Sequence, residues 1–301
     1  YPTSFEARDA ALRRLAFDEL LALQLGMVGR RRARGGERGR PVPVGSGRDL
    51  AIRGAIVAAL RAKVARQVDL TADQAAAIEA IRADIARPVP MLRLLQGDVG
   101  SGKTAVAAWA LAAVAMAGRQ GALLAPTDLL ARQHQRTLAE LIGPLGIGVE
   151  LLTGSMRAAD ANRTRELLAG GLARVVVGTH ALISESVRFA DLALAVVDEQ
   201  HRFGVEQRAA LEAKAGTGVP HVLLMTATPI PRTLGQVLYA DLDVTDLRTP
   251  PEGRIAVITG IKASAALDGT WQRVRDEARG GSRTFVVVPL IVPADSGSED
   301  E

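Results

Sequence analysis

Short apolar runs alternate with helix-length segments through the middle of the chain. The apolar runs lie at residues 91–96, 121–125, 149–152, 174–177, 194–197 and 222–226. This alternation is typical of βαβ units, in which buried parallel strands are covered by helices. We therefore predict an α/β fold with a parallel sheet, whose chemically active groups lie at the carboxyl ends of the strands.

Helical periodicity is clear before the first of these strands. Leu12, Leu15, Leu20 and Leu23 fall close to one stripe of an N-terminal segment, which predicts an amphipathic helix. A second helix is expected to pack on the sheet domain, and an alanine-rich helix is expected to follow the first strand. The predicted helices are at residues 6–27, 48–66, 105–117 and 129–141.

The remaining segments indicate how the chain is organised. Residues 30–40 (RRRARGGERGR) form a basic run interrupted by glycines, which predicts a loop, either a solvated linker or one that contacts phosphates. A helix near 267–278 and an apolar run at 284–288 look like the start of a further lobe that stops after one or two strands. We expect a helical linker segment at 1–66 with a basic loop at 30–48, a first lobe at 67–250 and a truncated second lobe at 251–301.

Composition narrows the class of protein. The 301 residues are 48% hydrophobic, include no cysteine and carry a formal net charge of +4, with a sequence pI near 9.9. The lack of cysteine excludes disulfides and thiol catalysis and is compatible with a cytoplasmic protein. Four scattered histidines give no metal-binding cluster, and the basic balance permits a nucleic-acid partner without establishing one. No membrane span or secretory signal is seen, and because the chain begins at Tyr1 we expect an excised fragment.

The most informative motif is GDVGSGKT at residues 97–104. It follows an apolar strand and precedes a helix, the setting in which a G-x-x-x-x-G-K-T loop binds nucleotide phosphates. Lys103 is expected to reach the β- and γ-phosphates and Thr104 to hold Mg²⁺, whereas the alternative is an ordinary glycine-rich turn. The candidate nucleotide-binding residues are Gly97, Asp98, Val99, Gly100, Ser101, Gly102, Lys103 and Thr104.

An acidic pair follows the strand at 194–197. Asp198 and Glu199 come at its carboxyl end, where a metal-side carboxylate and a water-activating base are needed beside a phosphate loop. Asp198 is therefore expected at Mg²⁺, and Glu199 beside the attacking water. Without the phosphate loop upstream, such a pair would be interpreted as a solvated turn.

A third element, Thr226-Ala227-Thr228-Pro229, ends the strand at 222–226. Its small hydroxyl side chains could hydrogen-bond the carboxylates of the neighbouring strand end. An ordinary strand exit closed by Pro229 remains open as the alternative, because the residue before a proline is restricted in conformation.

In this order the three elements resemble motifs I, II and III of superfamily 2 helicases. The longer strings QGDVGSGKT (96–104), DEQHRFGV (198–205) and MTATPIPRTL (225–234) resemble the RecG family of bacterial ATP-dependent DNA helicases. The transcription-repair coupling translocase Mfd shares most of the last string, but Ser101 and Gln200 are more similar to RecG. The resemblance extends over most of residues 5–251.

The resemblance also implies roles for individual residues. Gln74, in the first turn of a helix that Thr71 could cap, is expected to bind the adenine edge, unless it is an ordinary exposed glutamine. Hydroxyls at three further strand ends are expected to contact the DNA backbone, although the same residues suit helix caps. The DNA-contact candidates are Thr127, Thr153, Ser155 and Thr179, and the residues expected to couple nucleotide state to DNA movement are Gln200, His201, Thr226, Thr228 and Arg232.

The fold implied by this resemblance is a RecA-like P-loop NTPase lobe, preceded by a helical linker and followed by a partial second lobe. The resemblance implies ATP and Mg²⁺ as cofactors and branched double-stranded DNA as the substrate. It also implies that the protein is a monomer and that a single-stranded DNA-binding protein is a partner. The implied function is branch migration and stalled-fork regression in DNA recombination and repair. Motifs V and VI are not found in the 301 residues, so the fragment alone is expected to be inactive. The alternatives are an Mfd-like translocase and a nucleotide-binding module without turnover.

Overall fold

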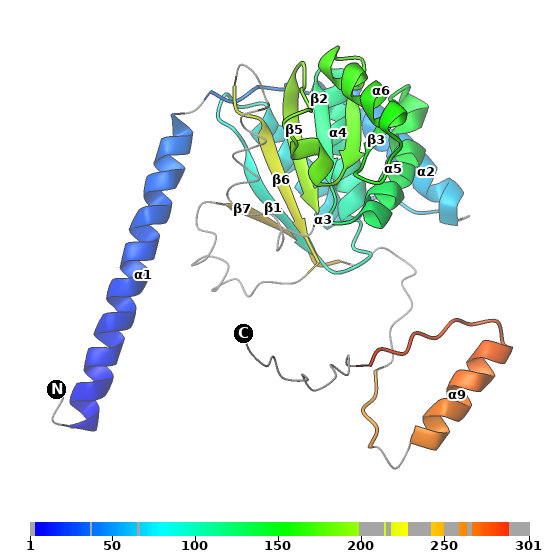
Figure 1. Ribbon diagram of the computed structural model, residues 1–301. Helices are drawn as coiled ribbons and strands as arrows, with labels where there is room; N and C mark the ends of the chain where they lie inside the picture. Colours follow the sequence, from blue (N-terminus) through cyan, green and yellow to red (C-terminus); the bar gives the residue numbers. More distant parts are fainter. Residues whose placement is uncertain are drawn as a thin grey trace, which may run out of the picture. The chain divides into compact units, whose positions relative to one another are not determined.

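The computed structural model divides the chain into two compact units, Tyr1–Arg254 and Ile255–Glu301 (Figure 1). Each unit is described by itself. The residues that the structure describes are 4–36, 38–64, 67–198, 214, 218–227, 242–249, 259–263 and 267–288.

The first unit is built on a parallel sheet of seven strands, in the order β3-β4-β2-β5-β6-β1-β7 (Figure 1). The strands are β1 (Leu92–Gly97), β2 (Gln120–Leu124), β3 (Val149–Leu152), β4 (Val175–Gly178), β5 (Leu192–Asp198), β6 (His221–Thr226) and β7 (Asp243–Leu247). All six predicted strands are present, with ends displaced by two residues or fewer. The α/β fold class with its parallel sheet is therefore confirmed.

The edge strand β7 was not predicted from the sequence. Its five residues, Asp243–Leu247, include two aspartates and alternate poorly between apolar and polar positions. β7 pairs only with β1 in the sheet, and Val244 is half exposed there. Because edge strands are solvated on one side, they need little apolar sequence, and β7 lacked the pattern that identified its neighbours.

The first unit also contains six α-helices among its described residues. Those of the first unit are α1 (Phe5–Gly35), α2 (Ser46–Val64), α3 (Ala72–Ile85), α4 (Lys103–Met116), α5 (Asp128–Ile142) and α6 (Ala158–Ala169), with short 3-10 turns η1 (Gly143–Leu145) and η2 (His180–Ile183). The helices predicted at 48–66, 105–117 and 129–141 correspond to α2, α4 and α5. None of the helices in the described part of the chain is long and apolar enough to cross a membrane.

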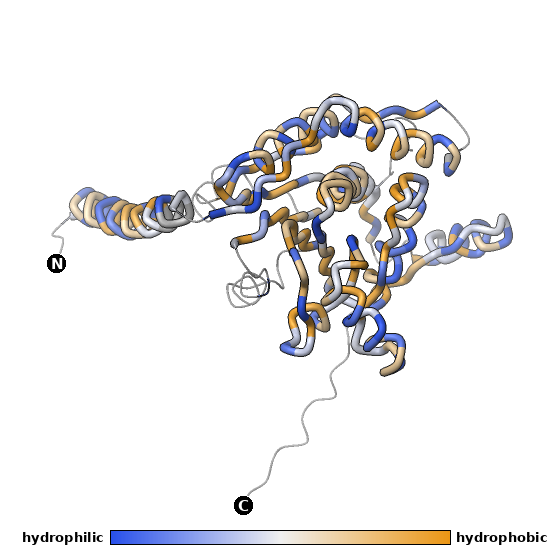
Figure 2. The backbone as a smooth tube through the Cα atoms, turned by 90° about the horizontal axis from the view of Figure 1, so that it is seen from above, coloured by the Kyte–Doolittle hydropathy of each residue, from blue (hydrophilic) through white to orange (hydrophobic). Residues whose placement is uncertain are grey.

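The helix α1 corrects one prediction. The basic run at 30–40 was expected to form a loop, but α1 continues through its first half and ends at Gly35. Arginine and alanine favour helix, and the helix ends only where two glycines follow each other. In Figure 2, hydrophilic and hydrophobic positions alternate along α1 next to the N label, and Leu12, Leu15 and Leu23 are exposed.

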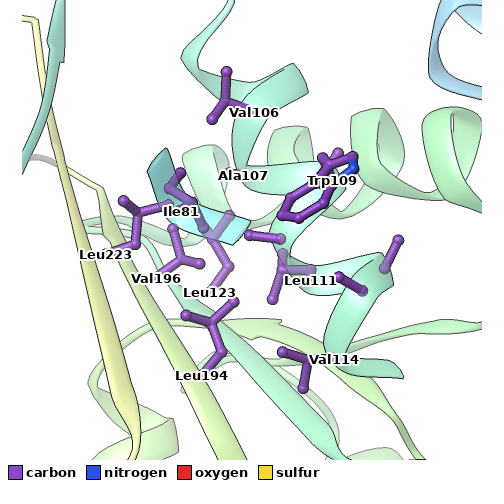
Figure 3. Packing of buried hydrophobic residues seen from close by; sticks show 14 of the residues in the cluster. Ile81, Val106, Ala107, Trp109, Leu111, Val114, Leu123, Leu194, Val196 and Leu223 are labelled. Atoms are coloured by element: carbon purple, nitrogen blue, oxygen red, sulfur yellow. The ribbon is translucent and has the colours of Figure 1, made fainter. Parts of the chain in front are cut away.

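The core lies on both faces of the sheet, because neighbouring strand residues point to opposite sides. On β2, Leu123 joins the cluster formed with α3, α4 and α5, whereas Ala122 and Leu124 join the cluster beneath α6. Figure 3 shows the first cluster, with Leu111 and Val114 of α4 beside Leu123, Leu194 and Val196 of the strands. α4 is buried from Ala105 to Ala115, and its alanines let it lie close to the sheet.

α2 packs against α4 and α5, as predicted for the helix before the sheet domain. The indole Nε1 of Trp109 donates a hydrogen bond of 2.9 Å to Asp49 Oδ1 in the first turn of α2. Arg53 and Arg82 pair with the same buried carboxylate. This network joins α2 to the helix that follows the phosphate loop.

In the second unit, α9 (Leu267–Arg279) confirms the helix predicted near 267–278. The apolar run at 284–288 was expected to be a strand, and this prediction was wrong for the described structure. Phe285, Val286, Val287 and Val288 are exposed and belong to no strand. A strand needs a hydrogen-bonding partner, and among the described residues of this unit none is present to pair with it.

Candidate functional site

The segment 97–104 runs from the last residue of β1 through a loop at 98–102 into the first turn of α4, as the motif predicts. Gly100 and Gly102 have φ angles of 80° and 87°, in the left-handed region that glycine adopts without strain. A Cβ atom at Gly102 would also overlap the side-chain amide of Gln74. The loop therefore brings backbone N–H groups and the positive end of the α4 dipole to one point, where anions bind.

Lys103 lies over this loop. Its Nζ donates hydrogen bonds to the carbonyl oxygens of Gly97 (2.6 Å) and Asp98 (3.2 Å). Thr104 follows in the first turn of α4 and is half-buried, whereas Val99 at the loop tip is 70% exposed. The ammonium group is thus held by two carbonyl groups at the start of the loop.

Gln74 connects the loop to α3. Its side-chain Nε2 donates to Ser101 O (2.8 Å), and its Oε1 accepts from Thr71 N (3.0 Å), which completes a capping box at the start of α3. The side chain is buried, so the alternative of an ordinary exposed glutamine does not hold. The adenine contact stays a prediction.

The strand β7, which was not predicted, packs against the start of the phosphate loop. A Cβ atom at Gly97 would come within 2.9 Å of Leu247 Cβ at the end of β7. The Asp73 carboxylate in α3 accepts hydrogen bonds from the backbone N–H groups of Arg248 (2.9 Å) and Thr249 (2.6 Å). These hydrogen bonds, that from Thr249 first, lower the pKa of Asp73. α3, the loop and the chain after β7 are therefore tied together.

Asp198 lies at the carboxyl end of β5, between the ends of β2 and β6. Thr226 is buried at the end of β6, where it is paired with Gln96 next to the loop, so this part of the third element does reach the same edge. The predicted residues Glu199, Gln200, His201, Thr228 and Arg232 lie outside the described residues.

The partner that the structure gives Asp198 is His134, which sequence reasoning missed. His134 Nε2 on α5 lies 2.6 Å from Asp198 Oδ2, and both side chains are mostly buried. His134 occupies the buried stripe that α5 forms with Ala131 and Leu138. A polar residue in an otherwise apolar helix stripe needs a buried partner, and this signal was available in the sequence.

The four residues with predicted DNA-contact hydroxyls follow the carboxyl ends of β2, β3 and β4. These strands form the half of the sheet away from the phosphate loop. Thr127 is exposed and caps α5, since its Oγ1 accepts from Leu130 N (3.3 Å). Thr153 and Thr179 are buried, and Thr179 N donates to Leu152 O at the end of β3 (3.3 Å). The helix-cap alternative thus holds for Thr127, and the DNA contacts stay predictions.

Ser155 meets the first turn of α5. Its N–H and its hydroxyl both donate to Asp128 Oδ2, and Arg132 Nη2 approaches its Oγ at 3.4 Å. The hydrogen bond from the Ser155 hydroxyl is the main reason why the pKa of Asp128 is lowered. A carboxylate that stays ionised therefore lies among the predicted phosphate contacts.

A nucleotide fits the residues at the β1 end of the edge. The buried Ser101 Oγ has no hydrogen-bond partner within the described part of the chain, and Lys103 adds a cation beside it. Mg²⁺ is usually bound in proteins by one or two carboxylates together with substrate phosphates and water, and the Asp198 carboxylate and the Thr104 hydroxyl are oxygen donors of this kind. Their role at Mg²⁺ stays a prediction. No cluster of three or more metal-ligating side chains occurs in the described residues, and none is required for this mode.

Comparison with known proteins agrees with this geometry. Residues 71–237 match the profile of the family described as DEAD/DEAH box helicase. The chain is 42% identical over 306 aligned residues to an ATP-dependent DNA helicase RecG of Mycobacterium tuberculosis, covering 96% of this chain and 40% of that protein. It is 45% identical over 228 residues to a RecG of Treponema pallidum, covering 74% of this chain and 33% of the relative.

A solved structure of RecG bound to a three-way DNA junction superposes with a TM-score of 0.82 at 36% identity, covering 97% of this chain and 38% of that one. A DNA-bound structure of the helicase MrfA, at 20% identity and a TM-score of 0.55, shares the fold. The chain thus spans about 40% of the length of the mycobacterial relative.

Proposed function

The chain belongs to the DEAD/DEAH box helicase family as a RecG-type helicase region, and on this premise we propose that it is the ATP-driven motor of a DNA helicase acting on branched DNA. The observation that carries the proposal is the arrangement of the site. The phosphate loop with Lys103 and the carboxylate of Asp198 lie at the same edge of one parallel sheet. The proteins reported above at 36% identity or more are all RecG, which favours RecG over an Mfd-like translocase.

In the proposed mechanism, the loop N–H groups and Lys103 bind the β- and γ-phosphates of ATP. Lys103 would exchange its carbonyl partners at Gly97 and Asp98 for phosphate oxygens, which are stronger acceptors because they are charged. Asp198 and the Thr104 hydroxyl would hold Mg²⁺, which neutralises charge on the phosphate oxygens when it is bound. Glu199 would orient and deprotonate the attacking water.

The DNA-facing role is proposed for the other half of the same edge. Thr127, Thr153, Ser155 and Thr179 would meet phosphodiester oxygens, which fix the position of a duplex without reading its sequence. Branched DNA is proposed as the substrate because the solved RecG at 36% identity is bound to a three-way junction. Fork regression and junction migration are the corresponding reactions of the whole protein.

The test is ATP hydrolysis by the full-length protein that contains this chain, with forked and with linear DNA of equal length. We expect forked DNA to stimulate hydrolysis more, and Lys103→Ala to abolish the stimulated rate, because it removes the cation facing the phosphates. Arg136→Ala, which removes an exposed positive charge from α5, is the control for loss of charge alone. Full stimulated turnover in Lys103→Ala would contradict the proposal.

A further inference from the structure

The contact between His134 and Asp198 joins two elements that the proposed mechanism treats separately. Asp198 is the proposed metal-side carboxylate, and His134 lies on α5, the helix that starts at the predicted DNA contacts. We propose that His134 is a positioning residue that orients the Asp198 carboxylate and transmits DNA contact at the start of α5 to the nucleotide site. This inference rests on the proposed function.

The chemistry of the contact fixes its direction. An ionised carboxylate only accepts hydrogen bonds, so Nε2 of His134 carries the proton and donates it to Asp198 Oδ2. Holding Oδ2 restricts rotation of the carboxylate, and Oδ1 is the oxygen that would hold Mg²⁺ in the proposed mechanism. Hydrogen-bond partners of this kind, one step away from a metal, typically change metal affinity or activity by about ten- to hundred-fold when they are removed.

The position of His134 on α5 makes it suited to transmit a signal. Thr127 caps the helix, and His134 comes seven residues later, about 10 Å along the axis at 1.5 Å per residue. The same first turns carry Asp128, which binds Ser155 from the end of β3. A phosphate bound at this end would therefore act on the helix segment that holds the ring of His134.

The second half of α5 is anchored differently. Leu138, Leu141 and Ile142 are buried against the sheet and neighbouring helices, whereas Leu129 in the first turn is 76% exposed. Gln135 next to His134 donates to Val149 O of β3 (3.0 Å), a contact that does not involve Asp198. A shift of the first turns of α5 relative to its buried second half would therefore change the position of His134.

A simpler alternative is that His134 only satisfies a buried carboxylate. The two roles differ in what they predict. A structural bridge would lower the thermal midpoint and reduce hydrolysis equally with and without DNA. A positioning link would reduce the DNA stimulation and the Mg²⁺-dependent part of nucleotide affinity, while leaving DNA affinity itself unchanged.

The experiment compares His134→Ala, His134→Gln and Gln135→Ala in the full-length protein. Glutamine can place an amide donor near the position of Nε2, and Gln135→Ala removes a hydrogen bond from the adjacent residue without touching Asp198. Four quantities are measured: the fold stimulation of ATP hydrolysis by forked DNA, the affinity for a fluorescent non-hydrolysable ATP analogue with and without Mg²⁺, the affinity for forked DNA without nucleotide, and the thermal midpoint.

We expect His134→Ala to reduce the stimulation and the Mg²⁺-dependent gain in analogue affinity by about ten-fold. Analogue affinity without Mg²⁺ and DNA affinity should stay within about two-fold of the unaltered protein, because neither binding surface loses a contact. His134→Gln should recover part of both losses, and Gln135→Ala should show neither. His134→Asn, whose amide is too short to reach Asp198, replaces His134→Ala if the latter does not fold.

Equal losses with and without DNA in His134→Ala, or the same losses in Gln135→Ala, would overturn the inference and leave a structural bridge. Asp198→Asn separates this outcome from failure of the proposed function. If Asp198→Asn hydrolyses ATP at the full rate, the metal-side assignment and the proposed mechanism fail. If it is inactive while His134→Ala keeps its full stimulation and Mg²⁺ dependence, only the role of His134 is overturned.

Discussion

The side-chain Nε2 of Gln74 donates a hydrogen bond of 2.8 Å to the backbone carbonyl of Ser101 inside the phosphate loop. One buried amide thereby caps α3 and supports the loop that receives the phosphates. The amide has a second N–H and a second lone pair on Oε1, so it can also meet a donor and an acceptor of a base. Loop support and adenine recognition are compatible in this geometry.

This arrangement predicts two separable effects of Gln74→Ala. Loss of the Ser101 contact should weaken binding of both ATP and GTP, since the loop loses a support. Loss of the adenine contact should weaken the binding of ATP further and so reduce the difference in affinity between ATP and GTP. Titration of both nucleotides against the full-length protein measures the two effects. If both affinities fall by the same factor, Gln74 supports the loop and does not read the base.

A substitution at Gly102 tests the contact between Gln74 and the phosphate loop by changing the loop instead of the glutamine. Gly102→Ala should abolish nucleotide binding, because a left-handed alanine costs about 1–2 kcal/mol and its Cβ would displace the Gln74 amide. The matched control is Gly118→Ala, at a φ of 79° with no atom within 4 Å of the added Cβ. Both variants should lose stability in thermal unfolding, but only Gly102→Ala should lose the nucleotide. Intact ATP binding in Gly102→Ala would contradict the geometry of the loop.

The sequence predicted the sheet interior and the phosphate loop because both depend on local patterns. Buried parallel strands require continuous apolar runs, and the loop requires glycines at fixed spacing. The sequence failed where the determining partner is remote. Strand β7 is stabilised by pairing with β1, and the role of His134 depends on a residue 64 positions away. The helix at residues 30–35 differs from the predicted loop because arginine has a high helix propensity, which a run of like charges does not cancel.

His221 gives the fold a predictable response to pH. Its Nδ1 accepts from Met91 N (2.9 Å), and its Nε2 lies 2.8 Å from Arg40 O, so the buried ring is neutral with the proton on Nε2. Burial lowers the pKa of His221 below its usual value of about 6.5. Between the folded-state pKa and about 6.5, the unfolded chain binds a proton that the folded chain does not. Stability should therefore fall as pH drops below about 6.5 and stay constant above it.

Thermal midpoints measured from pH 7.5 to 5.0 check this expectation against His221→Phe. The variant should be less stable at pH 7.5, because each buried backbone group left without a partner costs about 1–3 kcal/mol. Its midpoint should also change less with pH than that of the unaltered protein, since the titrating ring is gone. Identical pH profiles in the two proteins would exclude His221 as the source.

Asp128 provides the sharpest test of the predicted DNA-binding edge. Its ionised carboxylate holds the Ser155 hydroxyl at the start of α5, among side chains expected to meet phosphates. If duplex DNA lies there, this charge repels the backbone, and Asp128→Asn should strengthen binding by a few-fold at low salt. The gain should shrink toward physiological salt as screening shortens the range of the repulsion. It should not depend on base sequence, because phosphate contacts do not read bases.

Glu166→Gln is the matched control for Asp128→Asn, since it removes the same charge from an exposed position near the end of α6, the next α-helix along the chain. Binding of random duplexes to the full-length protein at several salt concentrations measures both variants. A gain confined to Asp128→Asn places the phosphates at the start of α5. Equal gains in DNA affinity in the two variants would reflect net charge alone. If neither variant binds DNA more tightly, the DNA does not lie at the start of α5.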